Sequence, residues 1–530
     1  MDPVQNMLVT AMQNSGFYPH PADRVELVET HISWVFLAGD FAYKLKKPLD
    51  FGFLDFSTLE RRRHFCHEEL RLNQRFAPQL YLEVVSIGGC PEHPRLNGEP
   101  VLDYAVRMKR FPACRQLDRM QAAGRLTATQ VDRFATLIAQ LHAQAPVAGP
   151  GREFGCPESI IAPIRQNFTQ LKTLLPDSMR DRLAELEAWS RTASRQLAGI
   201  LRQRKERGFI RECHGDVHLG NMAWFEDQPL LFDCIEFNEN LRWIDLINDI
   251  AFLVMDLDDR GEERFGWQFL NRYLRQSGDY RGLQLLAFYK VYRAMVRAKV
   301  FSLRLSQEDL AAAERAEDER LVQSYLDLAA GYTKPPRPAL IITHGLSGAG
   351  KTTIVEQLAP CCRAICLHSD VERKRRHHLE LTAASDSPVA AGLYTDKSSA
   401  ETYRNLRDLA ESLLGSGLNT IIDATFIRQQ SRTLMRQLAE KLRAPLLILD
   451  FQIAAHDLER RIRQRSLQAG QISEATLDVL HFQQSRSEPL DREELKSSIP
   501  ITSDMSVAEI AKRIAGRLRE RGTAEDSGPD

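Results

Sequence analysis

The sequence predicts an α+β region followed by an α/β domain, and three observations support this division. The length of 530 residues exceeds what one hydrophobic core can serve, since domains average about 150 residues. Strand-like segments fill the first 112 residues, and long helical stretches follow them. Beyond residue 338, short apolar strands alternate with helices, which is typical of a parallel sheet covered by helices on both faces.

Changes in composition set the expected boundaries. We expect a small lobe over residues 1–112, a helical large lobe over 113–332, a linker over 333–338, an α/β domain over 339–518 and a disordered tail over 519–530. The linker reads TKPPRP, and its three prolines oppose continuation of the preceding helix.

The composition and the start of the sequence predict a cytoplasmic protein without a global charge that would favour nucleic acid or a membrane. Lysine and arginine total 70 against 71 acidic residues, so no net charge attracts nucleic acid or an anionic membrane. The sequence has no secretory leader pattern and no uninterrupted apolar run of about 18 residues. Its nine cysteines contain no C-x-x-C pair, which favours a reducing compartment.

The elements of the first region follow from local patterns. Residues 31–47 predict a β-hairpin, because aromatic and β-branched residues alternate on both sides of a Gly-Asp turn. A helix is expected from residue 57 to 76, with Ser57 and Glu60 as a capping box. The segments NMAWF and PLLFDCIEF predict two short strands around the turn EDQ, inside the otherwise helical region.

A first candidate site lies in the segment HGDVHLGN, which covers residues 214–221. Asp216 and Asn221 stand five residues apart on an expected loop, and Asp233 ends the following strand. One carboxylate can accept a hydroxyl proton, while an amide oxygen and a second carboxylate hold Mg²⁺ against nucleotide phosphates. Two alternatives remain, namely a turn that only caps backbone groups and a hydrolase metal site formed by His214, Asp216 and His218.

With this motif, the first 330 residues resemble the aminoglycoside phosphotransferase family, which shares the bilobal protein-kinase fold. The resemblance implies that Asp216 is the catalytic base, that Asn221 and Asp233 are metal ligands, and that His214 supports the loop. It also implies that Asp249, in DLINDIAF, buttresses the active-site loop.

The same resemblance extends upstream to the segment AYK. It implies that Lys44 contacts the α- and β-phosphates and that Glu69 is its ion-pair partner. Lys46 shares the strand face of Lys44, and Glu68 adjoins Glu69, so either could substitute in this pair. MKRF resembles the hinge that meets adenine. The family's G-x-G-x-x-G loop is missing, because the hairpin tip offers a single glycine.

A second candidate site is the segment GLSGAGKT, which fits G-x-x-x-x-G-K-[ST] between an apolar strand and a helix. Glycines let backbone amides converge on phosphate oxygens, Lys351 reaches the β- and γ-phosphates, and Thr352 ligates Mg²⁺. The expected nucleotide-binding residues are Gly345, Ser347, Gly348, Ala349, Gly350, Lys351, Thr352 and Thr353.

Further charged residues follow the strands of the second domain. Asp370 stands at the carboxyl edge of the sheet, and Asp423 ends another strand, where it could hold Mg²⁺ or accept a hydroxyl proton. Arg461 and Arg465 lie four residues apart on one helix face and could close over the transferred phosphate, or could simply be solvated.

This half resembles the small P-loop kinases of the nucleotide-kinase and gluconate-kinase type, which are grouped with AAA-like ATPases. The resemblance implies that Asp370 and Arg373 contact the substrate and that residues 473–494 form a lid. The order of the two halves resembles bacterial proteins in which an aminoglycoside phosphotransferase domain is fused to an ATP-binding kinase domain.

Both sites together predict a phosphotransferase that uses ATP and Mg²⁺ and transfers the γ-phosphoryl group to a hydroxyl of a small polar molecule. The alternative is a regulatory switch, in which the P-loop half binds ATP and controls the kinase-like half without an acceptor of its own. An RNA end or a protein side chain as acceptor is less favoured, because no basic and aromatic stripe is evident.

Overall fold

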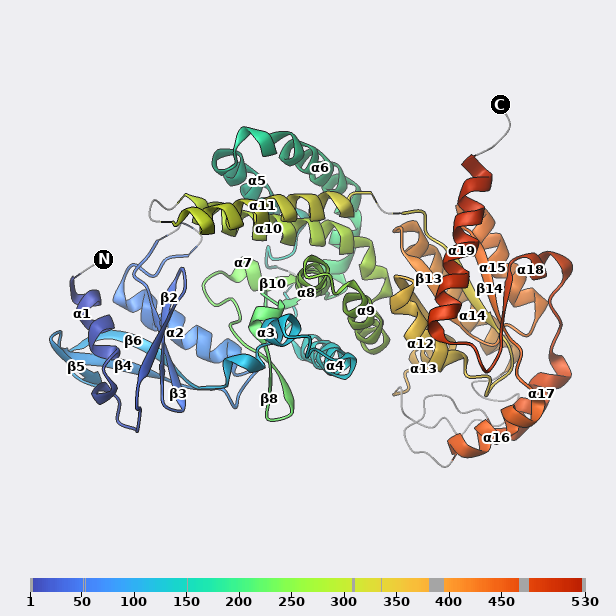
Figure 1. Cartoon of the computed structure of the whole chain (residues 1–530), viewed down its shortest axis with the longest axis horizontal. Coiled ribbons are helices and arrows are strands. Elements are labelled where there is room, and N and C mark those ends of the chain that lie inside the picture. Colours follow the sequence, from blue (N-terminus) through green and yellow to red (C-terminus); the bar gives the residue numbers. More distant parts are fainter. Residues whose placement is uncertain are drawn as a thin grey trace. The chain divides into compact units, whose positions relative to one another are not determined.

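The computed structural model describes residues 3–526, except positions 51, 53, 150, 307–309, 335, 381–394 and 467–475. The chain forms two compact units (Figure 1). The first unit contains Met1–Asp259 and Phe288–Ala329, and the second contains Arg260–Ala287 and Ala330–Asp530. The lobe and linker limits expected from the sequence remain predictions.

The first unit begins with a six-stranded antiparallel sheet in the order β1-β2-β3-β6-β4-β5. Its strands are β1 Val25–Glu29, β2 Ser33–Ala38, β3 Phe41–Lys46, β4 Tyr81–Cys90, β5 His93–Leu96 and β6 Val101–Lys109. The predicted hairpin is β2–β3, in which Val35 is paired with Lys44. Gly39 forms its tip at a φ of +55°, where a β-carbon would lie 2.3 Å from the carbonyl oxygen of Pro21.

Helix α2 packs on strands β4 and β6 and runs from Leu59 to Asn73. Its amino terminus differs from the predicted capping box. Thr58 is the N-cap and its hydroxyl accepts from the amide of Arg61 at 3.3 Å, whereas Ser57 bonds to Asp55. The N-cap therefore lies one residue later than predicted, because Asp55 engages both the amide and the hydroxyl of Ser57. The helix also ends at Asn73, before the predicted residue 76.

The rest of the first unit is helical, as predicted. Its helices include α3 Leu117–Ala122, α4 Ala128–Gln144, α5 Pro157–Leu174, α6 Asp177–Glu206, α7 Glu239–Arg242, α8 Leu246–Asp259, α10 Leu286–Leu305 and α11 Ala312–Tyr332. Two small antiparallel ribbons interrupt them: β7 Ile210–Glu212 with β10 Trp243–Asp245, and β8 Met222–Phe225 with β9 Gln228–Leu231. Asp233 follows β9 instead of ending a strand, at a φ of +63°.

The second unit contains a five-stranded parallel sheet in the order β12-β13-β11-β14-β15, flanked by helices (Figure 1). Its strands are β11 Leu340–His344, β12 Ala364–His368, β13 Asn419–Asp423, β14 Leu446–Phe451 and β15 Ser498–Ile501. Its helices include α9 Glu263–Ser277, α12 Lys351–Cys361, α13 Ser369–Arg376, α14 Asp396–Gly415, α15 Gln429–Leu442, α16 Ala455–Ser466, α17 Leu477–Arg486, α18 Arg492–Lys496 and α19 Val507–Asp526. Helix α19 thus extends through most of the predicted tail.

The open edge of this sheet is covered by a helix from an earlier part of the chain. Strand β12 is the edge strand, and α9 packs against it. The carboxamide of Asn271 donates to the carbonyl oxygen of Ala364 at 2.9 Å and accepts from the amide of Cys366 at 2.7 Å. A side chain therefore satisfies backbone groups that a further strand would otherwise pair.

Two further properties of the described residues concern membrane-spanning helices and disulfide bonds. Within the described residues, none of the helices has the length and apolar character needed to cross a membrane. All nine cysteines lie in the described part of the chain, and each carries a free thiol.

Candidate functional site

The loop that begins at His214 is fixed by its own histidine. The buried imidazole accepts at Nδ1 from the amide of Asp216 at 3.3 Å, so its proton resides on Nε2. Nε2 donates to the carbonyl oxygen of Phe232 at 3.0 Å. Burial keeps the pKa of His214 below its ordinary value. A neutral imidazole therefore ties the loop to the segment that precedes Asp233.

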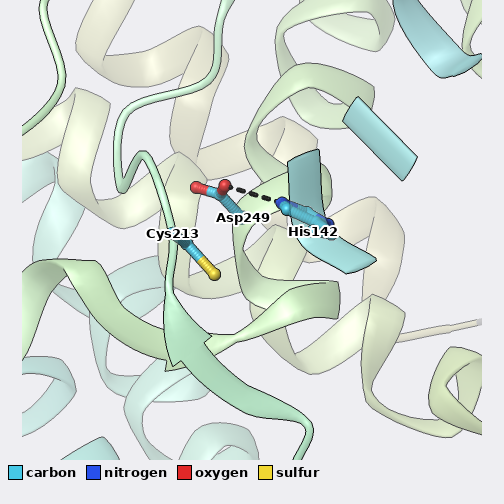
Figure 2. A group of neighbouring side chains, drawn as sticks. All are labelled: His142, Cys213 and Asp249. Carbon is cyan, nitrogen blue, oxygen red and sulfur yellow. Dashed lines mark hydrogen bonds and ion pairs between the residues drawn. The ribbon is translucent and has the colours of Figure 1, made fainter. Parts of the chain in front are cut away.

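Asp249, on α8, holds the same loop through its carboxylate, which also contacts His142 (Figure 2). Its Oδ1 accepts from the amide of Gly215 at 2.8 Å, and its Oδ2 accepts from the amide of His214 at 3.2 Å and from Nε2 of His142 at 3.1 Å. The carboxylate is almost fully buried, and three N–H donors satisfy it. This geometry suits a support of the loop, as the sequence predicted.

Figure 2 also shows Cys213 beside Asp249 and His142. One potential ligand atom from each of these three residues lies within 4.8 Å of the others. Burial raises the pKa of the Cys213 thiol well above its ordinary value, so the thiol keeps its proton. Because Asp249 is already engaged by backbone amides, the group is better described as a hydrogen-bonded core than as a metal site.

Asp216 presents a partly exposed carboxylate beside an amide side chain. Nδ2 of Asn221 donates to Oδ2 of Asp216 at 2.8 Å and to its carbonyl oxygen at 3.1 Å. This arrangement leaves the Asn221 side-chain oxygen as a possible ligand. Burial would raise the pKa of Asp216, but His218, which lies 3.4 Å away, and the nearby His214 and Arg293 hold it below the ordinary value. The carboxylate is therefore ionised at neutral pH and can accept a proton.

The structure pairs Lys44 with Glu69, as expected, and also with Asp233. Nζ of Lys44 lies 2.8 Å from Oε1 of Glu69 and forms an ion pair with Asp233. Lys44 and Glu69 are buried, whereas the Asp233 side chain is 45% exposed. The amide of Asp233 donates to the hydroxyl of Tyr81 at 3.1 Å. The β3 lysine, the α2 glutamate and the candidate metal ligand thus meet in one place.

Lys46 and Glu236 complete this cluster. Lys46 was predicted as an alternative to Lys44, whereas Glu236 was not identified from the sequence. Nζ of Lys46 lies 2.6 Å from Oε2 of Glu69 and pairs with Glu236, and no part of the Lys46 side chain is exposed. Burial would raise the pKa of Glu69, but the ammonium groups of Lys44 and Lys46 lower it to about 2. The sequence signal was the shared strand face of the two lysines. Glu236 had no signal beyond its place three residues after Asp233.

In the second unit, the predicted P-loop connects β11 to α12. Three of its glycines have positive φ values, namely +140° at Gly345, +84° at Gly348 and +85° at Gly350. Nζ of Lys351 is folded back onto the carbonyl oxygens of Gly345 and Leu346, at 3.0 and 2.8 Å. Positive φ values at three glycines give the loop the tight turn that a phosphate-binding loop requires.

Thr352 and Asp423 form the polar pair at the end of the sheet. The Thr352 hydroxyl donates to Oδ2 of Asp423 at 2.7 Å, and Nδ1 of His368 lies 3.0 Å from the same oxygen. Burial would raise the pKa of Asp423, but His368, Thr352 and Lys351 lower it. Hydroxyl and carboxylate oxygens are the donors that Mg²⁺ prefers. His368 was not identified from the sequence.

The remaining predicted residues of the second unit differ in the contacts that they make. Arg373 donates to Oδ1 of Asp370 at 3.0 Å, so these two form a pair on α13. Arg461 donates to the carbonyl oxygen of Ala349 at 3.3 Å. The side chain of Arg465 lies outside the described residues, as do positions 473–475 of the expected lid. Thr353 is exposed at the start of α12, and the loop amide of Ser347 donates to Gln483 of α17 at 2.9 Å.

Comparison with known proteins identifies both halves. Residues 55–286 match the family model described as the phosphotransferase enzyme family, and residues 340–490 match that of an AAA domain. An uncharacterized protein of Mycobacterium tuberculosis H37Rv is 30% identical over 464 residues, which cover 86% of this chain and 88% of that protein. An uncharacterized protein of Mycobacterium bovis gives the same values.

Solved structures resemble each half at lower identity. The amicoumacin kinase hAmiN, in complex with AMP-PNP and Ca²⁺, is 14% identical with a TM-score of 0.39, over 62% of this chain and 94% of that one. A sugar kinase from Janibacter is 21% identical with a TM-score of 0.27, over 34% of this chain and 95% of that one.

Proposed function

Because the chain belongs to the same family as these mycobacterial proteins and joins a phosphotransferase domain to an AAA domain, we propose that it is an ATP- and Mg²⁺-dependent phosphotransferase with two nucleotide sites. The acceptor at each site is a hydroxyl of a small polar molecule. The observation that carries the proposal is the convergence of Lys44, Glu69 and Asp233 beside the loop that bears Asp216.

In the first unit, Asp216 accepts the proton of the acceptor hydroxyl. The hydroxyl oxygen forms a bond to the γ-phosphorus, and the bond from that phosphorus to the β,γ-bridging oxygen breaks. ADP leaves with the electron pair, and Asp216 later returns its proton to water. Lys44 binds the α- and β-phosphates, while Glu69 keeps its ammonium group in position.

Oxygen donors in both units fit a magnesium ion. Asn221 and Asp233 would hold it in the first unit, and Thr352 and Asp423 in the second. When bound, Mg²⁺ neutralises charge on the β- and γ-phosphates. The free thiols and the use of ATP support a cytoplasmic location.

In the second unit, the proposed acceptor binds near Asp370 and Arg373, and Arg461 lies on the phosphate side. Lys351 turns from the loop carbonyls to the nucleotide phosphates, since a charged ligand offers a stronger partner. Asp423 aligns the hydroxyl group of Thr352 as a metal ligand or accepts a proton.

Two single substitutions test whether both sites turn over. We expect Asp216→Asn and Lys351→Ala each to remove a separate share of ADP formation, measured with a metabolite library as acceptors, and the double variant to remove all of it. If Lys351→Ala abolishes turnover at both sites, the P-loop half acts instead as a switch. If neither variant lowers ADP formation, the proposed function is wrong.

A further inference from the structure

Helix α10 of the kinase-like unit contains an arginine that the proposed reaction does not use. Arg297 lies on α10, one helical turn after Arg293 and therefore on the same face of the helix. Arg293 is buried, and its guanidinium donates to the carbonyl oxygen of Gly215 at 2.9 Å and to Oδ1 of Asn248 at 2.9 Å. Arg297 follows one turn later, about 5.4 Å along the helix axis.

Contacts of helix α8 show which loop this side of α10 approaches. The Arg293 guanidinium lies over the ring of Phe252 at 4.8 Å, and Phe252 in turn contacts the ring of His218. Burial lowers the pKa of Arg297, but the hydroxyl of Tyr325 and the charges of Asp256 and Asp216 raise it by more. Asp256 itself accepts from the amide of Leu219 at 2.9 Å, so it belongs to the wall of the same loop. Asp256 is one helical turn after Phe252, as Arg297 is one turn after Arg293, so Arg297 lies on the side of α10 that approaches the loop of Asp216.

Two aromatic rings hold the guanidinium of Arg297 in place, but the group makes only one long hydrogen bond within the described residues. Its carbon atom lies 5.4 Å from the ring centre of Phe301 and 5.9 Å from that of Tyr325, and these two rings are stacked. Its Nε donates to the Tyr325 hydroxyl at 3.5 Å, a long hydrogen bond. Among the residues that the structure describes, no carboxylate lies within ion-pair distance of it, and its terminal nitrogens have no acceptor.

The nearby carboxylates, in contrast, are already engaged. Asp256 holds the Leu219 amide, and Asp259 accepts from the Tyr325 hydroxyl at 2.8 Å. Burial raises the pKa of Tyr325 to about 12, so this phenol keeps the proton that it donates. A polycationic acceptor would require free carboxylates, whereas this surface offers a preorganised, partly exposed guanidinium.

We propose that the acceptor of the kinase-like unit carries a carboxylate or phosphate group, which Arg297 binds while the reacting hydroxyl lies at Asp216. This inference rests on the proposed function and narrows its acceptor to a small hydroxy acid or sugar phosphate. Arg297 determines specificity and takes no part in proton transfer. Its planar guanidinium offers two parallel donors to an anion, and stacking on Phe301 and Tyr325 limits the entropy lost on binding.

Matched acceptor pairs test the proposal in the full-length Lys351→Ala variant, which removes turnover at the P-loop. ADP formation is measured with glycerate against glycerol, gluconate against sorbitol, and ribose 5-phosphate against ribose. We expect at least one anionic member to be used at least tenfold better than its neutral partner, judged by kcat/KM. Equal use of the neutral members, or no use of any anionic member, overturns the anionic assignment.

Variants of Arg297 then identify the residue responsible. Arg297→Gln should raise the acceptor KM at least tenfold and leave the KM for ATP unchanged, and Arg297→Lys should fall between Arg297→Gln and the parent protein. Arg195→Gln, an exposed arginine on α6, is the matched control and should have no effect. Circular dichroism checks folding. If Arg297→Gln keeps the preference for the anion, the assignment of Arg297 is wrong.

The proposed function is tested separately by Asp216→Asn in the same background. If Asp216→Asn abolishes ADP formation but Arg297→Gln keeps the preference for the anionic acceptor, only the anion site is rejected. Persistence of ADP formation in Asp216→Asn would reject the proposed function itself.

Discussion

Lys46 and Glu236 form a buried ion pair that joins strand β3 to the segment after Asp233. The exposed fraction is 0% for the Lys46 side chain and 3% for that of Glu236. Lys46 also shares Glu69 with Lys44, so one glutamate organises two ammonium groups. The pair therefore connects the predicted phosphate contact to the predicted metal ligand.

Removing one member of this pair should be costly. Lys46→Leu leaves Glu69 and Glu236 close together without full compensation, so we expect the free energy of unfolding to fall by about 3–5 kcal/mol. The double variant with Glu236→Leu should regain part of this loss. Urea unfolding measures both. Lys172→Ala removes an exposed ion pair to Glu187 and should cost less than about 1 kcal/mol; a comparable cost for Lys46→Leu would contradict the prediction.

Asp249 should affect turnover through the loop it holds. Asp249→Asn replaces one of two accepting oxygens by a donor that opposes the loop amides, so we expect kcat at the first site to fall by about 100-fold, with little change in the KM for ATP. Steady-state ADP formation in the Lys351→Ala background measures this. His142→Gln retains an N–H donor toward Asp249 and should be milder than His142→Phe; equal effects would argue against the hydrogen bond.

The ionised state of Asp216 predicts a pH-dependent contribution to stability. Its pKa is lower in the folded protein than the unfolded value of about 3.9. Its contribution is therefore complete above about pH 5 and is lost as pH falls through the folded-state pKa. The stability difference between the parent protein and Asp216→Asn should shrink between about pH 5 and pH 2. Urea unfolding across this range checks it, and a constant difference would speak against a lowered pKa.

The Thr352 hydroxyl should be needed for magnesium at the P-loop. Thr352→Val removes both the donor to Asp423 and the oxygen ligand, so we expect Mg²⁺ to enhance ATP binding much less than in the parent protein. Calorimetric titration of ATP into Lys44→Ala protein, whose first site lacks its proposed phosphate contact, isolates the P-loop site when run with and without Mg²⁺. Thr352→Ser keeps the hydroxyl and should restore the enhancement; failure to do so would point to a packing effect instead.

Local patterns were sufficient to predict much of this fold. The β2–β3 hairpin, four strands of the parallel sheet and the P-loop follow from alternation, apolar runs and glycine spacing, which are properties of neighbouring residues. Strand β15 was missed because SIPI is short and has an exposed proline. The start of α2 was misassigned because Asp55, outside the helix, competes for Ser57.

The candidate sites were predicted where a motif contains the ligand itself, as at Asp216, Asn221 and Lys351. Glu236, His142 and His368 were not predicted, because their roles depend on partners far away in the sequence. His142 reaches Asp249 across 107 positions, and Glu236 reaches Lys46 across 190. One sequence carries no signal for such pairings.

The carboxamide of Asn271 has a practical meaning for any attempt to divide this polypeptide. A gene fragment that starts at the proline-rich linker would encode the whole parallel sheet but omit the helix that shields β12. The uncovered edge strand β12 would expose unpaired amide and carbonyl groups to other molecules and promote aggregation. Since the chain enters the second unit, returns to the first and enters the second again, the two cannot be expressed intact as consecutive halves.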